Sequence, residues 1–339
     1  MVGPLVGAFQ SGARPLTIFF LSAEVGATEN NVLVVTFVGP ALDTSGFSVT
    51  ADGSPLVVSS VSNNGSQSSL TLERVIYSSE TVLVSFSGGI AQSFTNEPVT
   101  NNGETPEETI DRVALGWWSA RTITTLWQDA ARTTQVASDG DVIHVADSRV
   151  GSFNFVAVSA SNRATYKTNQ VNGHPAIRCG DGATVTVLIA TTGAVTRPFY
   201  WLFIGKAHGY TGFPFILSAP GVESGGTYTG IRGGDNKFRL RDSTADLDES
   251  GTNFTVGDVR YIEAKFDGTG SSIRINDTTT SGTGGTPITT SVFNYGSSIT
   301  YSNPGDFDAT DIVLLPATVS NADLAIIRTH LKTTIGGLA

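Results

Sequence analysis

The stretch that decides the fold runs from residue 125 to residue 182. It begins Thr125-Leu126-Trp127-Gln128-Asp129-Ala130-Ala131 and ends Pro175-Ala176-Ile177-Arg178-Cys179-Gly180-Asp181-Gly182. His174 and Pro175 read as the lead into a strand, and the glycines after Cys179 indicate its end, so Cys179 is predicted to be a small buried residue. Charged residues make up only 15% of the 339-residue chain, while glycine occurs 38 times. With abundant Val, Thr and Ser, this composition indicates strands joined by many turns.

Residues 115–178 resemble the opening of the concanavalin-like (laminin-G-like) jelly-roll domains of phage structural proteins and bacterial surface proteins. The resemblance implies a jelly roll that binds or displays more often than it catalyses. Seven short apolar runs between residues 185 and 315 agree with a two-sheet sandwich. The segments that carry the resemblance are Leu115-Gly116-Trp117-Trp118, residues 125–131, Ala137-Ser138-Asp139-Gly140-Asp141-Val142, Asp147-Ser148, and residues 160–169 and 171–178.

Residues 18–101 alternate strand-like runs with turn clusters, a pattern typical of a β-sandwich. They resemble an immunoglobulin-like (Ig-like) repeat of bacterial cell-surface proteins, which implies a spacer. Gly88-Gly89 shortens the usual ending of the sixth strand and leaves the register of the last strand open. The matching segments are Ser22-Ala23-Glu24-Val25, Val35-Thr36-Phe37, Ala41-Leu42-Asp43, Phe47-Ser48-Val49, Thr81-Val82-Leu83-Val84-Ser85-Phe86 and Val99-Thr100-Asn101-Asn102.

The predicted fold class is all-β, in four segments. Residues 1–17 form an N-terminal arm, which is either an attachment peptide or a frayed terminus. An Ig-like β-sandwich covers 18–101, and a linker covers 102–112, in which Thr105 and Pro106 start a short helix. A concanavalin-like jelly roll covers 113–339. It closes with a short C-terminal helix over 320–331, capped by Ser320 with Asp323 three residues later.

Charge and cysteine content exclude several classes of protein. The formal net charge is −10, and no Lys/Arg cluster offers the basic face that nucleic acid requires, so nucleic acid is not expected as a partner. The single cysteine rules out an intramolecular disulfide. No run approaches the roughly 18 apolar residues that a membrane span needs, so membrane insertion is not expected. Residues 1–23 make a poor signal peptide, which suits a particle component released by lysis or a protein exported by another route.

Two sets of residues are candidate ligand sites. Aromatic rings stack on sugar faces, so Tyr210, Phe213 and Trp201 are candidate glycan-binding residues, with core packing and loop anchoring as the alternative. Clustered carboxylates suit Ca²⁺, and the alternative is a solvated acidic loop. The candidate calcium ligands, all in one predicted loop, are Asp242, Asp246, Asp248 and Glu249. No other cofactor is expected.

Catalytic residues are not apparent. Glu263 and Asp267 share one face of a predicted strand, but Lys265 lies between them on that face, and the alternating carboxylates of glucan-cleaving concanavalin-like enzymes are missing. The four histidines, His144, His174, His208 and His330, lack metal-ligand spacing, and His330 is expected on the exposed face of the last helix.

The leading hypothesis is therefore a non-enzymatic phage virion protein: a tail fibre, baseplate appendage or capsid decoration that displays an adhesion or glycan-binding jelly roll. Its expected location is the virion. Its expected partners are other virion proteins, bound through the arm, and a host-surface glycan. Because repetition strengthens weak binding, a homo-oligomer is expected, with a trimer favoured. The alternatives are a bacterial cell-surface or secreted adhesin and a glycan-degrading enzyme.

Overall fold

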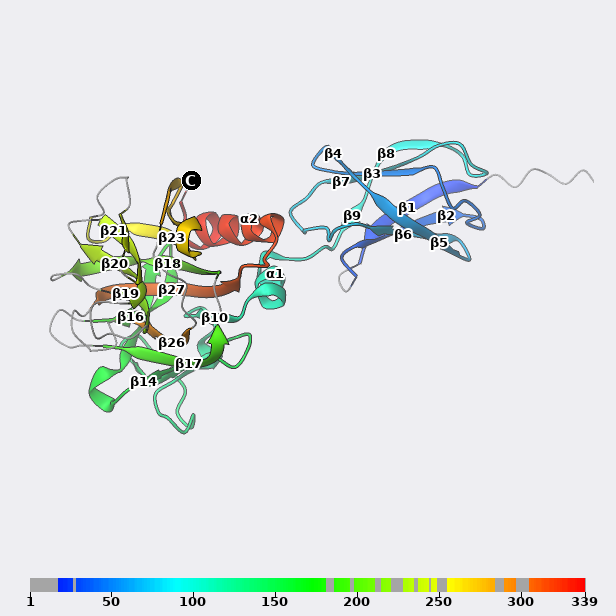
Figure 1. The fold of residues 1–339 in the computed structure, drawn as a ribbon. Helices are drawn as coiled ribbons and strands as arrows, with labels where there is room; N and C mark the ends of the chain where they lie inside the picture. The colour runs from blue at the N-terminus through cyan, green and yellow to red at the C-terminus, as the bar shows by residue number, and fades with distance from the viewer. Residues whose placement is uncertain are drawn as a thin grey trace, which may run out of the picture. The chain divides into compact units, whose positions relative to one another are not determined.

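The structure is a computed structural model that describes residues 18–338, apart from 27–28, 181–185, 196–197, 211–214, 221–227, 235–236, 244, 249–254, 284–289 and 297–304. At some strand positions it describes the backbone alone: 192–194, 208–210, 215–216, 218–220, 228–234, 237, 239, 241–243, 245–246, 248, 290–291 and 305–306. The predicted arm, residues 1–17, lies outside the described residues. The chain divides into two units, Met1–Pro106 and Glu107–Ala339 (Figure 1).

The first unit is a β-sandwich of two antiparallel sheets. One sheet has the order β5-β6-β2-β1-β9, in which only the short β9 runs parallel to its neighbour, and the other has the order β4-β3-β7-β8. The strands are β1 (Phe19–Val25), β2 (Val32–Val38), β3 (Phe47–Ala51), β4 (Ser54–Leu56), β5 (Val58–Asn64), β6 (Gln67–Leu72), β7 (Val82–Phe86), β8 (Phe94–Pro98) and β9 (Thr100–Asn101).

Strict alternation builds the core of this sandwich, because side chains two apart on a strand share a face. Along β2, Leu33, Val35 and Phe37 are buried while their neighbours are more exposed. Asp52 and Gly53 both have positive φ, the conformation that a two-residue hairpin turn between β3 and β4 requires. The register of the last strand, open from the sequence, pairs Thr100 and Asn101 of β9 with Glu24 and Val25 of β1.

Residues 54–64 of the first unit contribute to both sheets. Their first strand, β4, pairs with β3 in one sheet, and their second, β5, pairs with β6 in the other. The chain changes sheets at Val57, which belongs to neither strand. Periodicity alone does not reveal such a change, because the chain remains extended on both sides of it.

The second unit is a larger β-sandwich. Its β27 sheet has the order β12-β15-β16-β27-β18-β23-β24-β25, with β10 also paired to β27. The bounds are β10 (Gly116–Ser119), β12 (Val142–Ile143), β15 (Ala164–Val171), β16 (His174–Cys179), β18 (Phe199–Tyr210), β23 (Val259–Phe266), β24 (Ser271–Ile275), β25 (Thr278–Gly282) and β27 (Gly305–Pro316). As predicted, Cys179 ends a strand and is fully buried.

The facing β14 sheet has the order β11-β13-β14-β17-β26-β19-β20-β21-β22. The bounds are β11 (Leu126–Trp127), β13 (Val145–Ala146), β14 (Phe155–Ala157), β17 (Leu188–Val195), β19 (Phe215–Pro220), β20 (Tyr228–Gly234), β21 (Lys237–Ser243), β22 (Ala245–Asp248) and β26 (Thr290–Tyr295). Trp118, Trp201 and Phe293 pack with many other apolar side chains in the core between the two sheets. The all-β fold class is thus confirmed.

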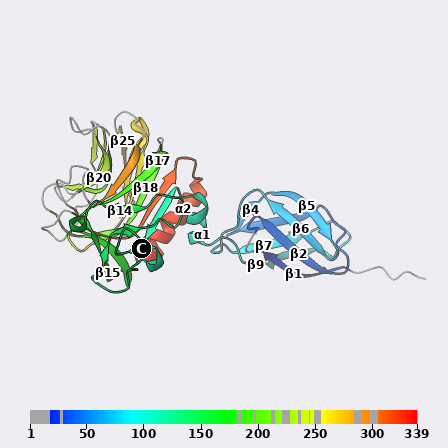
Figure 2. The ribbon, with the colours of Figure 1, turned by 90° about the horizontal axis from the view of Figure 1, so that it is seen from below.

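Two helices cover the outer face of the β27 sheet. The second unit contains α1 (Pro106–Val113), which starts at the unit boundary, and α2 (Asn321–Thr329), followed by the π-helical η4 (His330–Ile335). Ile110 of α1 and Ile327 of α2 share a separate apolar cluster with Trp117, Leu202 and Val313 of the sheet, and Figure 2 shows both helices on that side of the unit. The predicted C-terminal helix is confirmed, and Ser320 Oγ caps it by accepting from Asp323 N at 3.0 Å. Short 3₁₀ turns, η1 (Ile123–Thr125), η2 (Ala160–Asn162) and η3 (Gly268–Gly270), complete the elements.

The predicted linker, residues 102–112, contains both exposed and buried residues. The unit boundary falls within it, after Pro106. On one side of the boundary Glu104 is buried, and the Asn101 amide donates to the carbonyls of Tyr77 and Glu80. On the other side α1 packs into the second unit through Ile110, an apolar residue in a segment that is otherwise mostly polar.

Candidate functional site

The acidic residues of the resemblance segment stabilise turns. Asp129 accepts from Thr133 N and Thr134 N, and Asp141 accepts from Ala137 N and Ser138 N. These backbone hydrogen bonds lower the pKa of both carboxyl groups. Asp139 is bound in the same way by Thr168 N. The three carboxylates therefore hold the loop in shape.

A groove of about 400 Å³ lies on the outer face of the β14 sheet. Neither α1 nor α2 packs here, since both belong to the apolar cluster on the β27 sheet. The described residues that line it are aliphatic or polar. The aliphatic side chains are those of Val156, Val158 and Ile189, and Ala157 also borders the groove although its side chain lies in the core. The polar residues are Arg132, Ser152, Asn154 and Thr191.

Strand register explains why aliphatic side chains reach this surface. Phe155 and Ala157 of β14 point into the core, so Val156 between them points outward. Val156 pairs with Ile189 of β17, which in turn pairs with Asn294 of β26. Val156 is 36% exposed and Val158 is 47% exposed. A row of outward side chains thus crosses three neighbouring strands.

Arg132 is held firmly beside this row. Its Nε donates to both oxygens of Asp147 at 3.0 and 2.9 Å, and Nη2 donates to Oδ1 at 2.7 Å. The Trp127 indole N–H also donates to Asp147 Oδ2, at 2.9 Å. These hydrogen bonds raise the pKa of Arg132, which remains charged. The guanidinium is 38% exposed and is the one charged side chain among the described residues that line the groove.

Asn294 extends the row beneath the surface. It alternates with Phe293 and Tyr295 of the core, which places it on the outer side of the sheet. The residue is fully buried, yet among the described residues neither its amide nitrogen nor its amide oxygen has a hydrogen-bond partner. A buried amide without partners is unusual, because desolvating it costs about 1–3 kcal/mol.

The predicted glycan residues fall in different environments. Trp201 is 2% exposed and packs against Trp118 and Phe293, so its ring is not available to a sugar. The central position of β18 in its sheet explains this burial. The side chain of Tyr210 and all of Phe213 lie outside the described residues.

The predicted acidic loop is a hairpin. Asp242 belongs to β21, and Asp246 and Asp248 belong to β22, with Asp246 paired to Arg241 and Asp248 to Arg239. Glu249 and the side chains of the three aspartates lie outside the described residues. Within the described residues, no group of three or more His, Cys, Asp or Glu side chains is placed to hold a metal ion.

Glu263 lies under α2 in a structural ion pair. Its two oxygens accept from Nε and Nη2 of Arg328, both at 2.8 Å, and one also accepts from the Tyr261 hydroxyl at 2.7 Å. Asp267 lies past the end of β23 and pairs with Lys265. The two carboxylates considered for hydrolysis thus have different cationic partners.

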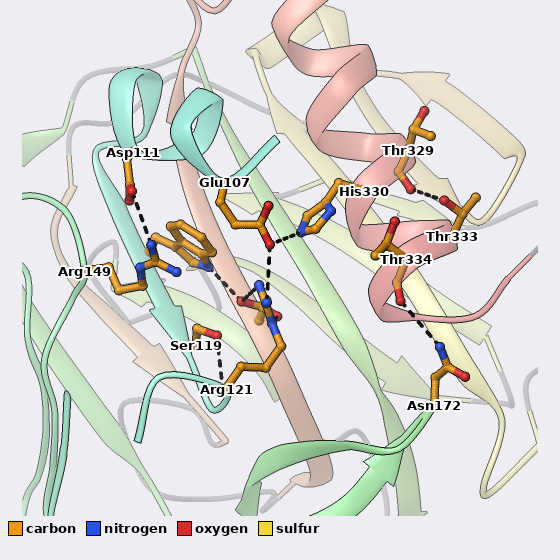
Figure 3. A network of polar contacts seen from close by, with 12 residues as sticks. Glu107, Asp111, Ser119, Arg121, Arg149, Asn172, Thr329, His330, Thr333 and Thr334 are labelled. Atoms are coloured by element: carbon orange, nitrogen blue, oxygen red, sulfur yellow. Dashed lines mark hydrogen bonds and ion pairs between the residues drawn. The ribbon is translucent and has the colours of Figure 1, made fainter. Parts of the chain in front are cut away.

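A network of titratable groups lies between α1, η4 and β27 (Figure 3). Buried Asp311 accepts from the Trp117 indole N–H at 2.7 Å and from Arg121 Nε at 2.9 Å. Arg121 also forms an ion pair with Glu107. Glu107 Oε1 lies 3.0 Å from His330 Nε2, but these two atoms are not aligned as a hydrogen bond. The network joins α1 to the sheet and to η4, and its Glu107 side chain is 34% exposed.

The expectation for His330 is wrong. The residue is buried, not exposed, because the chain continues from α2 into η4 and turns the ring toward α1. Burial lowers the pKa of His330, so the imidazole is neutral at neutral pH. Helical periodicity counted from residue 320 did not anticipate the π-helical turn.

Sequence reasoning missed the groove residues Arg132, Asn154 and Ile189. Arg132 has a positive φ of 58°, which is uncommon for a non-glycine residue. The sequence carries one usable signal, the run Val156-Ala157-Val158, but a continuous apolar run does not show which side chains face outward.

No protein-family model matches this chain, and no curated protein matches it. Solved structures show distant similarity. The Trypanosoma rangeli sialidase is 11% identical, with a TM-score of 0.40, over 94% of this chain and 53% of the sialidase. Domain 4 of the arabinanase AbnA from Geobacillus stearothermophilus is 13% identical, with a TM-score of 0.38, over 65% of this chain and 98% of that domain. A botulinum neurotoxin type C structure is 12% identical, with a TM-score of 0.36, over 66% of this chain and 53% of the toxin chain. This chain thus spans about half the length of the sialidase.

Proposed function

We propose that this protein is a non-enzymatic phage virion protein, a tail fibre, baseplate appendage or capsid decoration, and that its second unit binds a surface glycan in the groove beside Arg132. The virion setting is supported by the resemblance of residues 115–178 to phage jelly-roll domains. The glycan site is supported by one structural observation above all. The β14 sheet carries a groove on its outer face, whereas helices cover the outer face of the β27 sheet.

The chemistry of the groove suits a sugar. A pyranose has an apolar C–H face and a rim of hydroxyl groups, so it needs an apolar surface next to hydrogen-bonding groups. Val156 and Ile189 supply the apolar surface. Arg132 and the hydroxyl group of Thr191 supply hydrogen bonds, and the amide of Asn154 is oriented by accepting from Ser148 N at 3.0 Å.

The non-enzymatic proposal is supported by the carboxylates. Glycoside hydrolysis ordinarily uses two carboxyl groups about 5–9.5 Å apart on either side of the scissile bond. The described residues that line the groove include no carboxylate. Asp147, which lies next to the groove, is occupied by Arg132 and Trp127.

Glycan binding is tested by calorimetric titration of purified protein with host-surface polysaccharide fragments. Val158→Asp places a charge on the apolar lining and is expected to weaken binding at least tenfold. Val256→Asp is the matched control, since both valines are 47% exposed and Val256 lies outside the groove. Equal affinity of the two variants, or no binding by the unaltered protein, would contradict the proposal.

The virion proposal includes assembly. We propose a homo-oligomer, with a trimer favoured, joined to other virion proteins through residues 1–17. Electron imaging of the intact particle should show the protein at repeated symmetric positions, and deletion of residues 1–17 should remove it from the particle. Finding the protein instead on a bacterial surface would favour the adhesin alternative, to which the Ig-like resemblance of the first unit points.

A further inference from the structure

The Arg132 guanidinium has an unused edge. Asp147 takes the Nε–H and one Nη2–H. Among the described residues no other acceptor binds this side chain, so both N–H groups of Nη1 and the second N–H of Nη2 remain free. These three N–H groups lie in one plane. Two of them, one on Nη1 and one on Nη2, are parallel and can donate to the two oxygens of one carboxylate.

The loop that carries Arg132 is organised before any ligand arrives. Arg132 N donates to Asp129 O, and the Asp129 carboxylate accepts from the two backbone N–H groups that follow Arg132. The positive φ of Arg132 is thereby held in place. Because the guanidinium is also fixed by Asp147, little side-chain entropy remains to be lost on binding.

The charge balance at the free edge favours an anion. Asp147 binds the adjacent edge of the guanidinium, formed by Nε and Nη2, and its charge is also compensated by the Trp127 indole N–H. A carboxylate on the free edge would approach the guanidinium to about 4 Å while remaining roughly twice as far from Asp147, so attraction exceeds repulsion. Within the described part of the chain, no residue that lines the groove is acidic.

We propose that the groove selects acidic sugars, and that their carboxylate binds the free edge of Arg132 while the C–H face of the ring packs on Val156 and Ile189. This inference depends on the proposed glycan site. Arg132 is in this view the residue that determines specificity, and Asp147 is its positioning residue.

The experiment compares sugars that differ only in the carboxyl group. The protein is titrated by calorimetry with trigalacturonate, trimannuronate and 3′-sialyllactose. It is also titrated with the same three compounds after their carboxyl groups have been reduced to alcohols. At least one acidic sugar is expected to bind ten times more tightly than its reduced form. The preference should shrink as salt rises from about 20 to 500 mM, because screening weakens exposed charge pairs.

Variants assign the preference to Arg132. Arg132→Gln should bind both forms of the sugar equally, and Arg132→Lys should regain part of the preference, because lysine keeps the charge without the planar fork. Arg163→Gln is the control, since Arg163 lies outside the groove and donates to its own turn at Ala160 O. Melting curves of each variant verify folding.

Three results are decisive. Equal binding of acidic and reduced sugars overturns the acidic-sugar inference and leaves the glycan proposal standing. If Arg132→Gln still binds acidic sugars more tightly than reduced ones, Arg132 does not determine the specificity. No binding of any acidic or reduced sugar, together with no binding of host polysaccharide, overturns the glycan proposal itself.

Discussion

Replacing Glu263 by glutamine tests both the role of the ion pair under α2 and the enzyme alternative. Glu263 is 8% exposed and Arg328 is 24% exposed. Burial, with the nearby Glu263 carboxylate, raises the pKa of Tyr261 well above its usual value, so its hydroxyl stays protonated and donates. Glutamine keeps the shape of the side chain and one acceptor oxygen but loses the charge.

The expected loss of stability follows from these contacts. Breaking a buried ion pair by removing one partner costs about 3–5 kcal/mol. Glutamine retains one hydrogen bond and Arg328 is partly reached by water, so we expect about 2–3 kcal/mol. For a unit of this size, each kcal/mol lowers Tm by about 2–4 °C, which gives a decrease of about 4–12 °C.

Differential scanning calorimetry of the full chain measures this change. Asp277→Asn is the control, because it breaks a surface pair in which Asp277 is 65% exposed and Lys332 belongs to η4. Such pairs contribute about 0–1 kcal/mol. A Tm for Glu263→Gln within 1 °C of that control would refute the reasoning. The unaltered chain and Glu263→Gln are also assayed for reducing sugar released from polysaccharide, and we expect none from the unaltered chain. Release that Glu263→Gln abolishes would establish the enzyme.

Three further predictions concern the second unit. Asn294→Leu should raise stability by about 1–2 kcal/mol in denaturant titrations, because it removes a buried amide without partners; a loss of similar size would show that the amide is satisfied, for example by water. His330 has a lowered pKa in the folded protein. As the pH falls below about 6.5, its imidazole is therefore protonated in the unfolded chain before it is protonated in the folded chain, and the free energy of unfolding declines. His330→Gln should flatten that decline between pH 6.5 and 5, and an unchanged pH profile would contradict the burial of the ring. Finally, a protein of residues 107–339 should fold alone, whereas residues 114–339 should melt at a clearly lower temperature for want of Glu107 and Ile110; equal melting would contradict the packing of α1.

The sequence was sufficient wherever structure depends on local order. Alternation along residues 32–38 predicted β2, and Ser320 with Asp323 predicted the start of α2. Thr105 and Pro106 likewise predicted the start of α1. Each of these features depends on residues a few positions apart, so that periodicity and capping rules describe them directly.

The groove, by contrast, exists only because distant segments meet. Arg132 comes from a loop, Val156 from β14 and Ile189 from β17, and antiparallel pairing of these two strands brings their side chains together. The same pairing decides that Val156 faces outward while Phe155 beside it faces the core. A shift of the strand register by one residue would turn the outward side chains toward the core and the core side chains outward.

By itself, then, the sequence determined an all-β chain with a short C-terminal helix, since composition and period are local properties. Only the tertiary structure decided that Trp201 is buried, that His330 turns inward and that Glu263 serves as an ion-pair partner under α2. It also decided which sheet is covered by helices and which carries a groove. The physical reason is that exposure depends on which surfaces pack against each other, and packing joins residues that the sequence keeps far apart.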